Sequence, residues 1–418
     1  MIFLFLIFIL LAITITRTSS SYHTQNLRIL WFSSFCIYSL YTIISHSYVG
    51  NPTTTYFISS DQISFYGVAI DLSKYSFTKI YSLCFTEYNY NGSPLAYALF
   101  GTLAKIGQML GETDILLFLK FHVVFLASLI PIFTYKILLI YNQHIPNLYK
   151  KIFIFAIISP LFIYSCQLLR DIHICLLFTI MTYIALRPKQ HFRYFWLLLL
   201  MATTYSFRVE TGLFSATIIA IPLYRTYREG KLLKKMLIIS ILALFCVFAM
   251  LSILEVMSNT IGSYESSQIE SASAASLGNK LNALPIPLNY LSKTVFGQLL
   301  PFPIWLPLTG GENYAYLRFV ECFFPFYWIP IWLSLFYGWW KYRKQWNKDI
   351  LAMFYVSILF IILNSAGEFN ARRMMAVYPM LLICFLTLQQ QFNLKKLKTN
   401  RISFGLLIVL HIIYIIIK

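Results

Sequence analysis

Long apolar runs separated by short basic clusters constrain this chain more than any other feature. Each run has about 20 residues, the length that a helix needs to cross a bilayer. Only 11% of the 418 residues are charged, whereas about a quarter are charged in a soluble domain. The runs lack the ten-residue alternation of membrane β-barrels. The sequence therefore predicts an all-α, polytopic integral membrane protein with about 11–12 transmembrane helices and two larger outer segments.

The net charge of +18 would suit nucleic-acid binding if it were gathered on one surface. Instead, lysines and arginines stand in small groups between the apolar runs, the arrangement that orients helices in a membrane. The expected partner is therefore the lipid bilayer, and no nucleic-acid partner is expected.

We predict that the whole chain, residues 1–418, is one transmembrane domain. The expected spans are 1–15, 29–46, 115–141, 152–168, 172–186, 194–207, 211–224, 236–256, 317–340, 350–366, 374–391 and 402–417. The two long polar stretches, 47–114 and 257–315, are expected to be outer segments. The first of them should contain helices that lie in the membrane interface, such as 94–110.

The distribution of charge supports this arrangement. Most of the 33 lysines and arginines fall in the loops 17–28, 142–151, 187–193, 225–235, 341–349 and 392–401. Only Glu229 and Asp349 among the acidic residues accompany them. Because positively charged loops stay in the cytoplasm, these loops are predicted to be cytoplasmic and the other acidic residues to lie toward the outer side.

Ionisable side chains gather at the outer ends of several predicted spans, where charge near lipid is costly and suggests a function. Arginine matches phosphate oxygens with a planar fork of donors, and a nearby carboxylate can act as a base. We therefore predict a diphosphate-binding site made of Arg170, Arg208, Arg372 and Arg373. The candidate catalytic carboxylates are Asp61, Asp171 and Glu210, and the supporting one is Glu368.

The same residues also have structural explanations. Arg170 with Asp171, and Arg208 with Glu210, can be ion pairs at helix ends. Asp61 can cap an interfacial helix, because aspartate favours that position.

Four further polar residues lie in or beside spans. His122 and His173 are expected to be packed interior histidines, because no second ligand stands at zinc-like spacing. Lys120 and Lys136 are expected to extend their amino groups toward the membrane surface. The sequence predicts no metal and no cofactor.

Three stretches carry a resemblance to a known superfamily. The segments SSDQISFYGVA (59–69), NGSPLAYALFGTLAKIGQMLG (91–111) and SPLFIYSCQLLRDI (159–172) resemble the first part of the glycosyltransferase-C superfamily. Its members are membrane enzymes that use polyprenyl-linked sugar donors. The resemblance implies that Asp61 is the acidic residue of the first outer loop. No DxD sequence occurs and Gln62 follows Asp61, which argues against a metal-dependent donor site.

Other stretches resemble bacterial O-antigen and capsular polysaccharide polymerases. These are LLRD (168–171), RVETG (208–212) and NARRMMAVYP (370–379). The resemblance implies a multi-pass protein of the bacterial inner (plasma) membrane that acts in lipopolysaccharide or related polysaccharide biosynthesis. Its implied substrates are oligosaccharides linked to polyprenyl (undecaprenyl) diphosphate on the periplasmic face, and its implied partners are a chain-length regulator and a flippase.

The leading hypothesis is therefore a polymerase of surface polysaccharide repeat units. The first alternative is a glycosyltransferase-C enzyme that adds a single sugar from a polyprenyl-phosphate donor. The second is a flippase for lipid-linked glycans, which would be expected to show an internal repeat and charges at mid-membrane depth.

Overall fold

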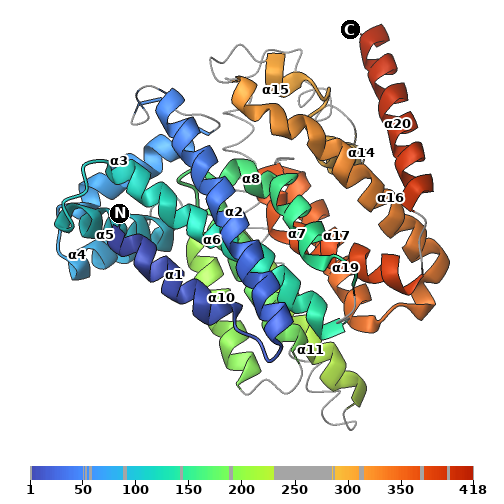
Figure 1. The fold of residues 1–418 in the computed structure, drawn as a ribbon, viewed down its shortest axis with the longest axis horizontal. Coiled ribbons are helices and arrows are strands. Elements are labelled where there is room, and N and C mark those ends of the chain that lie inside the picture. Colours follow the sequence, from blue (N-terminus) through green and yellow to red (C-terminus); the bar gives the residue numbers. More distant parts are fainter. Residues whose placement is uncertain are drawn as a thin grey trace.

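The computed structural model describes residues 2–49, 51, 54–55, 59–87, 92–141, 145–187, 192–229, 285, 288–309, 315–367, 371–392 and 396–417. Every regular element in these ranges is helical (Figure 1). The N-terminal elements are α1 (Ile2–Thr16), α2 (Ser21–Tyr48), α3 (Asp61–Ser73), α4 (Phe77–Ser82), η1 (Leu83–Glu87) and α5 (Pro94–Met109). The central elements are α6 (Ile115–Tyr141), α7 (Leu148–Ile157), α8 (Pro160–Ser165), α9 (Asp171–Leu186), α10 (Arg193–Phe207) and α11 (Val209–Glu229).

The C-terminal part is also helical. Its elements are α14 (Leu288–Leu299), α15 (Leu306–Thr309), η3 (Ala315–Phe323), α16 (Phe324–Tyr342), η4 (Arg343–Gln345), α17 (Lys348–Gly367), α18 (Ala371–Met374), η5 (Met375–Val377), α19 (Tyr378–Gln391) and α20 (Lys396–Ile417). The predicted all-α class is therefore confirmed for the described residues. The predicted span 236–256 and most of the second outer segment lie outside them.

Four helical stretches among the described residues are long and apolar enough to cross a membrane. They are Ser21–Tyr48, Ile115–Tyr141, Tyr316–Gln345 and Arg372–Gln391. Shorter apolar helices are Ile2–Thr16, Asp171–Leu186 and Arg401–Ile412. These seven stretches coincide with or overlap predicted spans, whereas the full arrangement of twelve spans stays a prediction.

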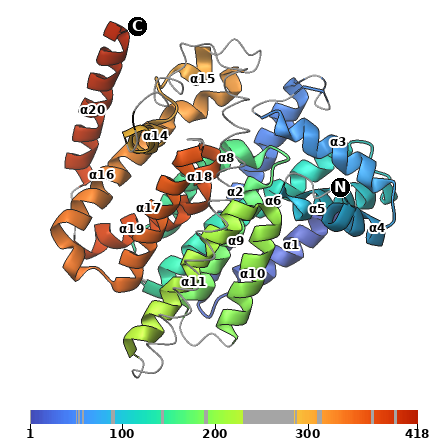
Figure 2. The same ribbon diagram turned by 180° about the vertical axis from the view of Figure 1, so that it is seen from behind.

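Helix α6 is the central element of the bundle. It packs against α2, α5, α7, α9 and α19, and Figures 1 and 2 show it between the N-terminal and the C-terminal helices. Most of its residues are buried. A helix that is apolar on all sides is stable only when neighbours cover it completely, so the composition of α6 accounts for its central place.

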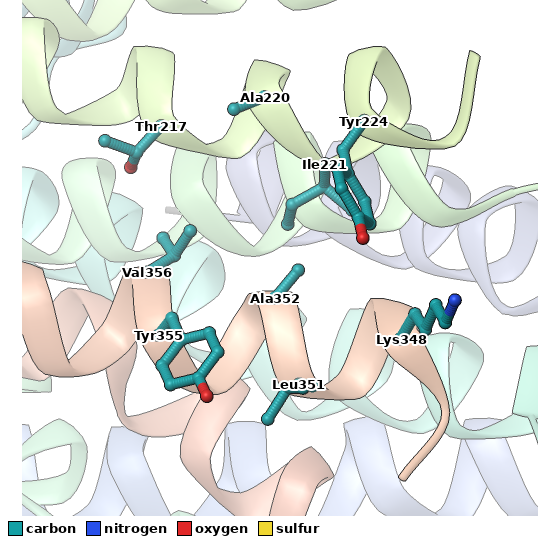
Figure 3. A pocket seen from close by; sticks show the side chains of 9 residues that line it. All are labelled: Thr217, Ala220, Ile221, Tyr224, Lys348, Leu351, Ala352, Tyr355 and Val356. Carbon is teal, nitrogen blue, oxygen red and sulfur yellow. The ribbon is translucent and has the colours of Figure 1, made fainter. Parts of the chain in front are cut away.

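Helices α11 and α17 pack side by side and leave a cavity of about 450 Å³ between them (Figure 3). Its wall is mainly apolar, with Ala220 and Ala352 on the two facing helices. Polar groups come from Tyr224, Tyr355 and Lys348, which begins α17. This cavity does not include any of the predicted site residues.

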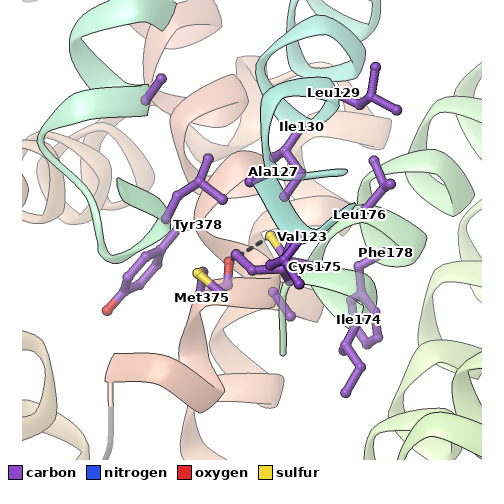
Figure 4. Close-up of a cluster of buried hydrophobic side chains, with 14 of the residues drawn as sticks. Val123, Ala127, Leu129, Ile130, Ile174, Cys175, Leu176, Phe178, Met375 and Tyr378 are labelled. Carbon is purple, nitrogen blue, oxygen red and sulfur yellow. Dashed lines mark hydrogen bonds between the residues drawn. The ribbon is translucent and has the colours of Figure 1, made fainter. Parts of the chain in front are cut away.

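A layer of apolar side chains joins α6, α9 and η5 in the core. Val123 of α6 and Cys175 of α9 lie beside Met375 of η5, and Ile130 and Ile174 belong to the same cluster (Figure 4). The Cys175 thiol donates a hydrogen bond to the Met375 carbonyl at 3.4 Å. This layer holds the start of α9 against η5 and the start of α19. The charged residues Asp171, Arg372 and Arg373 lie only a few positions from the residues of this layer in the sequence.

The predicted continuous span 152–168 is wrong. Helix α7 ends at Ile157, and α8 begins at Pro160 after the extended residue Ser159. Proline is favoured at the first position of a helix and forces the preceding residue out of the helical conformation. The break directs α8 toward the start of α9 (Figure 2).

Helices α10 and α11 are separated by a single residue, Arg208, whose backbone is extended (φ −163°, ψ 119°). The two helices pack closely on each other and on α9. At their contact, a Cβ on Gly212 would lie 2.2 Å from the Cα of Tyr205. The backbone leaves no room there for any side chain, so glycine is required.

Gly212→Ala should therefore destabilise the protein by about 1–3 kcal/mol through overpacking. Gly67→Ala in α3 is the matched control, because no atom lies within 4 Å of its added Cβ. The control should be neutral or gain about 0.5–1 kcal/mol from the helix preference of alanine. Unfolding of both variants in mixed micelles tests this, and equal stability of the two variants would contradict the close approach.

Candidate functional site

Asp171 lies at the centre of a charged cluster, at the first residue of α9. Its side chain is only 4% exposed. A carboxylate at a helix N-terminus is favoured by the positive end of the helix dipole, but burial of a charge is tolerated only with partners. The partners of Asp171 come from two distant parts of the chain.

The first partner is Arg208, at the break between α10 and α11. Its Nη1 donates to Oδ1 of Asp171 at 3.0 Å, and both side chains are buried. The sequence had suggested pairs within Arg170–Asp171 and within Arg208–Glu210, but the ion pair joins Asp171 to Arg208 instead. The observed pair therefore joins two segments that lie 37 residues apart in the chain.

The second partner is Arg372 of α18. Its Nε lies 3.5 Å from Oδ2 of Asp171, and its Nη1 lies 2.8 Å from Oδ2 of Asp61. The same Nη1 donates to the Ser59 hydroxyl at 2.8 Å. Arg372 therefore bridges a buried carboxylate and an exposed one, because the Asp61 side chain is 48% exposed.

Asp61 does not cap its helix as the alternative explanation proposed. Ser60 occupies the N-cap position of α3 and Asp61 is the first helical residue. The neighbouring Gln62 is buried, and its Oε1 accepts a hydrogen bond from the backbone N–H of Leu168 at 3.3 Å. This contact ties the start of α3 to the segment that leads into α9.

Arg170 and Arg373 complete the ring of arginines around Asp171, with which both interact electrostatically. Arg170 donates to the carbonyl of Phe207 at 3.5 Å. Burial, followed by the charge of Arg208, lowers the pKa of Arg170 to about 10. Glu210 lies close enough to Arg170 to act against that decrease.

The structure thus brings together the predicted site residues that lie in the described part of the chain. They are Asp61, Arg170, Asp171, Arg208, Glu210, Arg372 and Arg373. Glu368 lies outside the described residues. Within the described ranges, four arginines stand against three carboxylates, and guanidinium groups gathered in this way can bind an anion.

The pKa of Asp171 shows which charges control the cluster. Burial by itself would raise this pKa, but Arg208, Arg372, Arg170 and Arg373 together outweigh burial and lower it to about 2. The carboxylate is therefore ionised at any physiological pH. It serves as a fixed negative centre that holds the guanidinium groups in place.

A further ion pair at the same end of the molecule escaped the sequence analysis. In η3, Arg318 donates from Nε and Nη2 to the two carboxylate oxygens of Glu321 at 2.9 and 3.0 Å. Tyr164 of α8 interacts electrostatically with this pair and with Arg372 and Asp171. The Arg-x-x-Glu spacing was visible in the sequence, but it fell inside the predicted span 317–340.

Two histidines lie behind the cluster. The Nε2 atoms of His122 and His173 are 3.3 Å apart, and the His173 ring packs against Phe100 and Phe207. The prediction of packed interior histidines agrees with this geometry. No group of three histidine, cysteine, aspartate or glutamate side chains with metal-binding geometry is found within the described ranges.

The expectation that Lys120 reaches the membrane surface is wrong. Its side chain is 2% exposed, and its Nζ lies 3.4 Å from Nδ1 of His46. The Nε2 of His46 lies 2.7 Å from Oδ2 of Asp114. The contacts from Lys120 to His46 and from His46 to Asp114 thus offset the cost of burying the Lys120 amino group among the apolar residues of α6.

Comparison with protein families, with characterised proteins and with solved structures finds no match for this chain.

A double-mutant cycle on Asp171→Asn and Arg208→Gln should show strong coupling. Each single change leaves a buried charge without its main partner and should cost about 3–5 kcal/mol, while the double variant should cost clearly less than the sum. The control cycle uses Asp71 and Lys74, a pair at 2.7 Å whose side chains are 75% and 68% exposed. This exposed pair should show little coupling. Additive effects in the buried pair would contradict the salt bridge.

The depressed pKa of Asp171 predicts when acid removes its contribution. Stability from this carboxylate is present above its unfolded value of 3.8 and is lost as the pH falls toward 2. The difference in unfolding temperature between the wild type and Asp171→Asn should therefore stay constant from about pH 8 to pH 5 and shrink only below about pH 4. A difference that already shrinks between neutral pH and pH 5 would contradict the assignment.

Proposed function

We propose that the chain is a multi-pass protein of the bacterial inner membrane, with the Asp171 cluster on the periplasmic side. Four long apolar helices and the basic loops at the opposite ends of their spans support this arrangement. Many large apolar side chains are exposed on α1, α10 and α20. Contiguous exposed apolar surface is costly in water but favourable in lipid.

We propose that the cluster transfers a glycan from a polyprenyl diphosphate onto the incoming lipid-linked unit, as in polymerisation of O-antigen-like repeats. The observation that carries the proposal is the bridge made by Arg372 between Asp61 and Asp171. It places an accessible carboxylate beside a guanidinium, with the further arginines Arg170, Arg208 and Arg373 around Asp171. A diphosphate leaving group and an acceptor hydroxyl need these two groups side by side.

The roles of the carboxylates follow from their exposure. Asp171 is buried and held by two arginines, so it positions guanidinium groups and does not receive a proton. Asp61 is half-exposed and can reach an acceptor hydroxyl, so we assign it as the general base. Glu210 is partly exposed beside Arg170 and stays a second candidate.

The proposed reaction balances without a cofactor. The acceptor hydroxyl oxygen attacks the anomeric carbon while the bond from that carbon to the diphosphate oxygen breaks. Asp61 takes the hydroxyl proton, and the diphosphate departs with the bonding electron pair. Arg170, Arg208, Arg372 and Arg373 stabilise the negative charge that develops on it.

Addition of one sugar from a polyprenyl monophosphate is the second candidate. The position of Asp61 at the start of the first helix of the 47–114 segment favours it, since the glycosyltransferase-C resemblance rests on that carboxylate. The two candidates share the base and differ in product. A polymerase gives a ladder of repeat lengths, and a transferase gives a single added residue.

Asp61→Asn expressed in the native host from which the gene has been deleted tests the assignment of the base. Loss of a general base costs about 10²–10⁴-fold in rate, so long chains should disappear from a lipopolysaccharide or capsule gel. Asp71→Asn is the matched control on the same helix, because Asp71 is exposed and pairs only with Lys74 among the contacts described here. It should leave the ladder intact.

Arg372→Gln should also abolish the ladder, because it removes the contact to both carboxylates. Membrane amounts of each variant should be measured by immunoblot, so that lost activity is separated from lost protein. A normal ladder with both Asp61→Asn and Arg372→Gln would overturn the proposal.

A further inference from the structure

A second polar site lies at the other end of the bundle from the Asp171 cluster. It is a cavity of about 750 Å³ formed where α1 ends, where α9 ends and along the last turns of α6. The connection between α1 and α2 and the lower end of α6 lie together in Figure 1. Helix α9 runs from Asp171 to Leu186, and 16 residues span about 24 Å at 1.5 Å per residue. The cavity is therefore separate from the site described above.

Among the described residues, the cavity is lined by three cations, Arg17, Lys136 and Arg187, and by no acidic residue. Thr18 and Ser19 contribute polar groups, and Tyr183 forms part of the wall. The Arg187 guanidinium lies 5.8 Å from the centre of the Tyr183 ring. A cation–π contact of this kind holds a guanidinium without neutralising it.

The simplest alternative explanation is that these cations only neutralise helix C-termini. Lys136 does this, because its Nζ donates to the carbonyl of Ile15 near the end of α1. At the end of α9, however, the carbonyl of Arg187 accepts from Arg193, at 2.5 Å. Each helix end carries only about half a negative charge. The positive charge of Arg17 and Arg187 is therefore larger than the partial negative charge of the two helix ends.

We propose that this cavity binds a phosphate group. Two guanidinium groups, the Ser19 hydroxyl and the Lys136 ammonium group around one cavity match the oxygens of a phosphate. The volume lies in the range of small-molecule sites and exceeds that of a phosphate alone, so it can hold a headgroup.

The surroundings indicate where the phosphate comes from. Leu139 and Ile140 form an apolar part of the wall, and Leu10, Leu11 and Ile13 of the adjoining α1 are exposed. A phosphate placed beside an exposed apolar helix is the arrangement of an anionic lipid at the membrane surface. A free phosphate ion would use the same donors without the apolar contacts.

Binding to the full-length protein in a neutral detergent tests the proposal. The probes are phosphatidic acid, phosphatidylcholine and inorganic phosphate. Phosphatidic acid should bind and phosphatidylcholine should not displace it. The double variant Arg17→Gln/Arg187→Gln should bind phosphatidic acid about tenfold more weakly or worse, as expected for loss of two charges near an anionic headgroup. Both side chains are exposed, so the fold should persist.

The control is Arg28→Gln/Lys344→Gln, which removes the same charge from two exposed residues that do not line the cavity. It should keep the affinity of the wild type. Competition by inorganic phosphate at similar concentration would support the phosphate site and assign its source to a free ion. Equal loss in both double variants, or no preference for phosphatidic acid over phosphatidylcholine, would overturn the proposal.

Discussion

The contact of Arg372 with two carboxylates is the interaction on which the charged end of the molecule depends. Asp61 belongs to the first part of the chain, Asp171 to its middle and Arg372 to its C-terminal part. The apolar layer of Figure 4 brings α9 and η5 together, but apolar contacts are not directional. The guanidinium group adds direction, because its N–H groups donate to carboxylate oxygens only along fixed directions in one plane. Apolar packing thus brings the three segments near one another, and the ion pairs set their relative orientation.

Much of the fold could be predicted from the sequence because apolar length and basic loops are strong signals. The helix over 115–141 has the predicted ends. The break between α7 and α8 was missed, although Pro160 marks it in the sequence, because the apolar run continues across the proline and hydropathy does not record backbone direction. Lys120 was misplaced for a related reason. The spacing of apolar residues gives no information on a distant partner such as His46, which contacts the buried amino group of Lys120.

The residues of the candidate site could be predicted, but not their pairing. The arrangement of spans requires that Asp61, Asp171 and Arg372 share one side. It cannot show that Arg208 pairs with Asp171, because this depends on the one-residue break before α11 and on the close approach at Gly212. The Arg318–Glu321 ion pair was not predicted, because two charged residues at the edge of an apolar run are read as the end of a transmembrane span.

The shared guanidinium of Arg372 has a consequence for the order of events at the site. The Nη1 atom of Arg372 contacts both the Asp61 carboxylate and the Ser59 hydroxyl, while its Nε faces Asp171. In the proposed reaction, the diphosphate would compete with Asp61 for Nη1, whereas Nε, 3.5 Å from Oδ2 of Asp171, would keep its ion-pair contact. Under that proposal, binding of the donor would release the Asp61 carboxylate from Arg372. The shared guanidinium would thereby couple proton acceptance by Asp61 to binding of the donor.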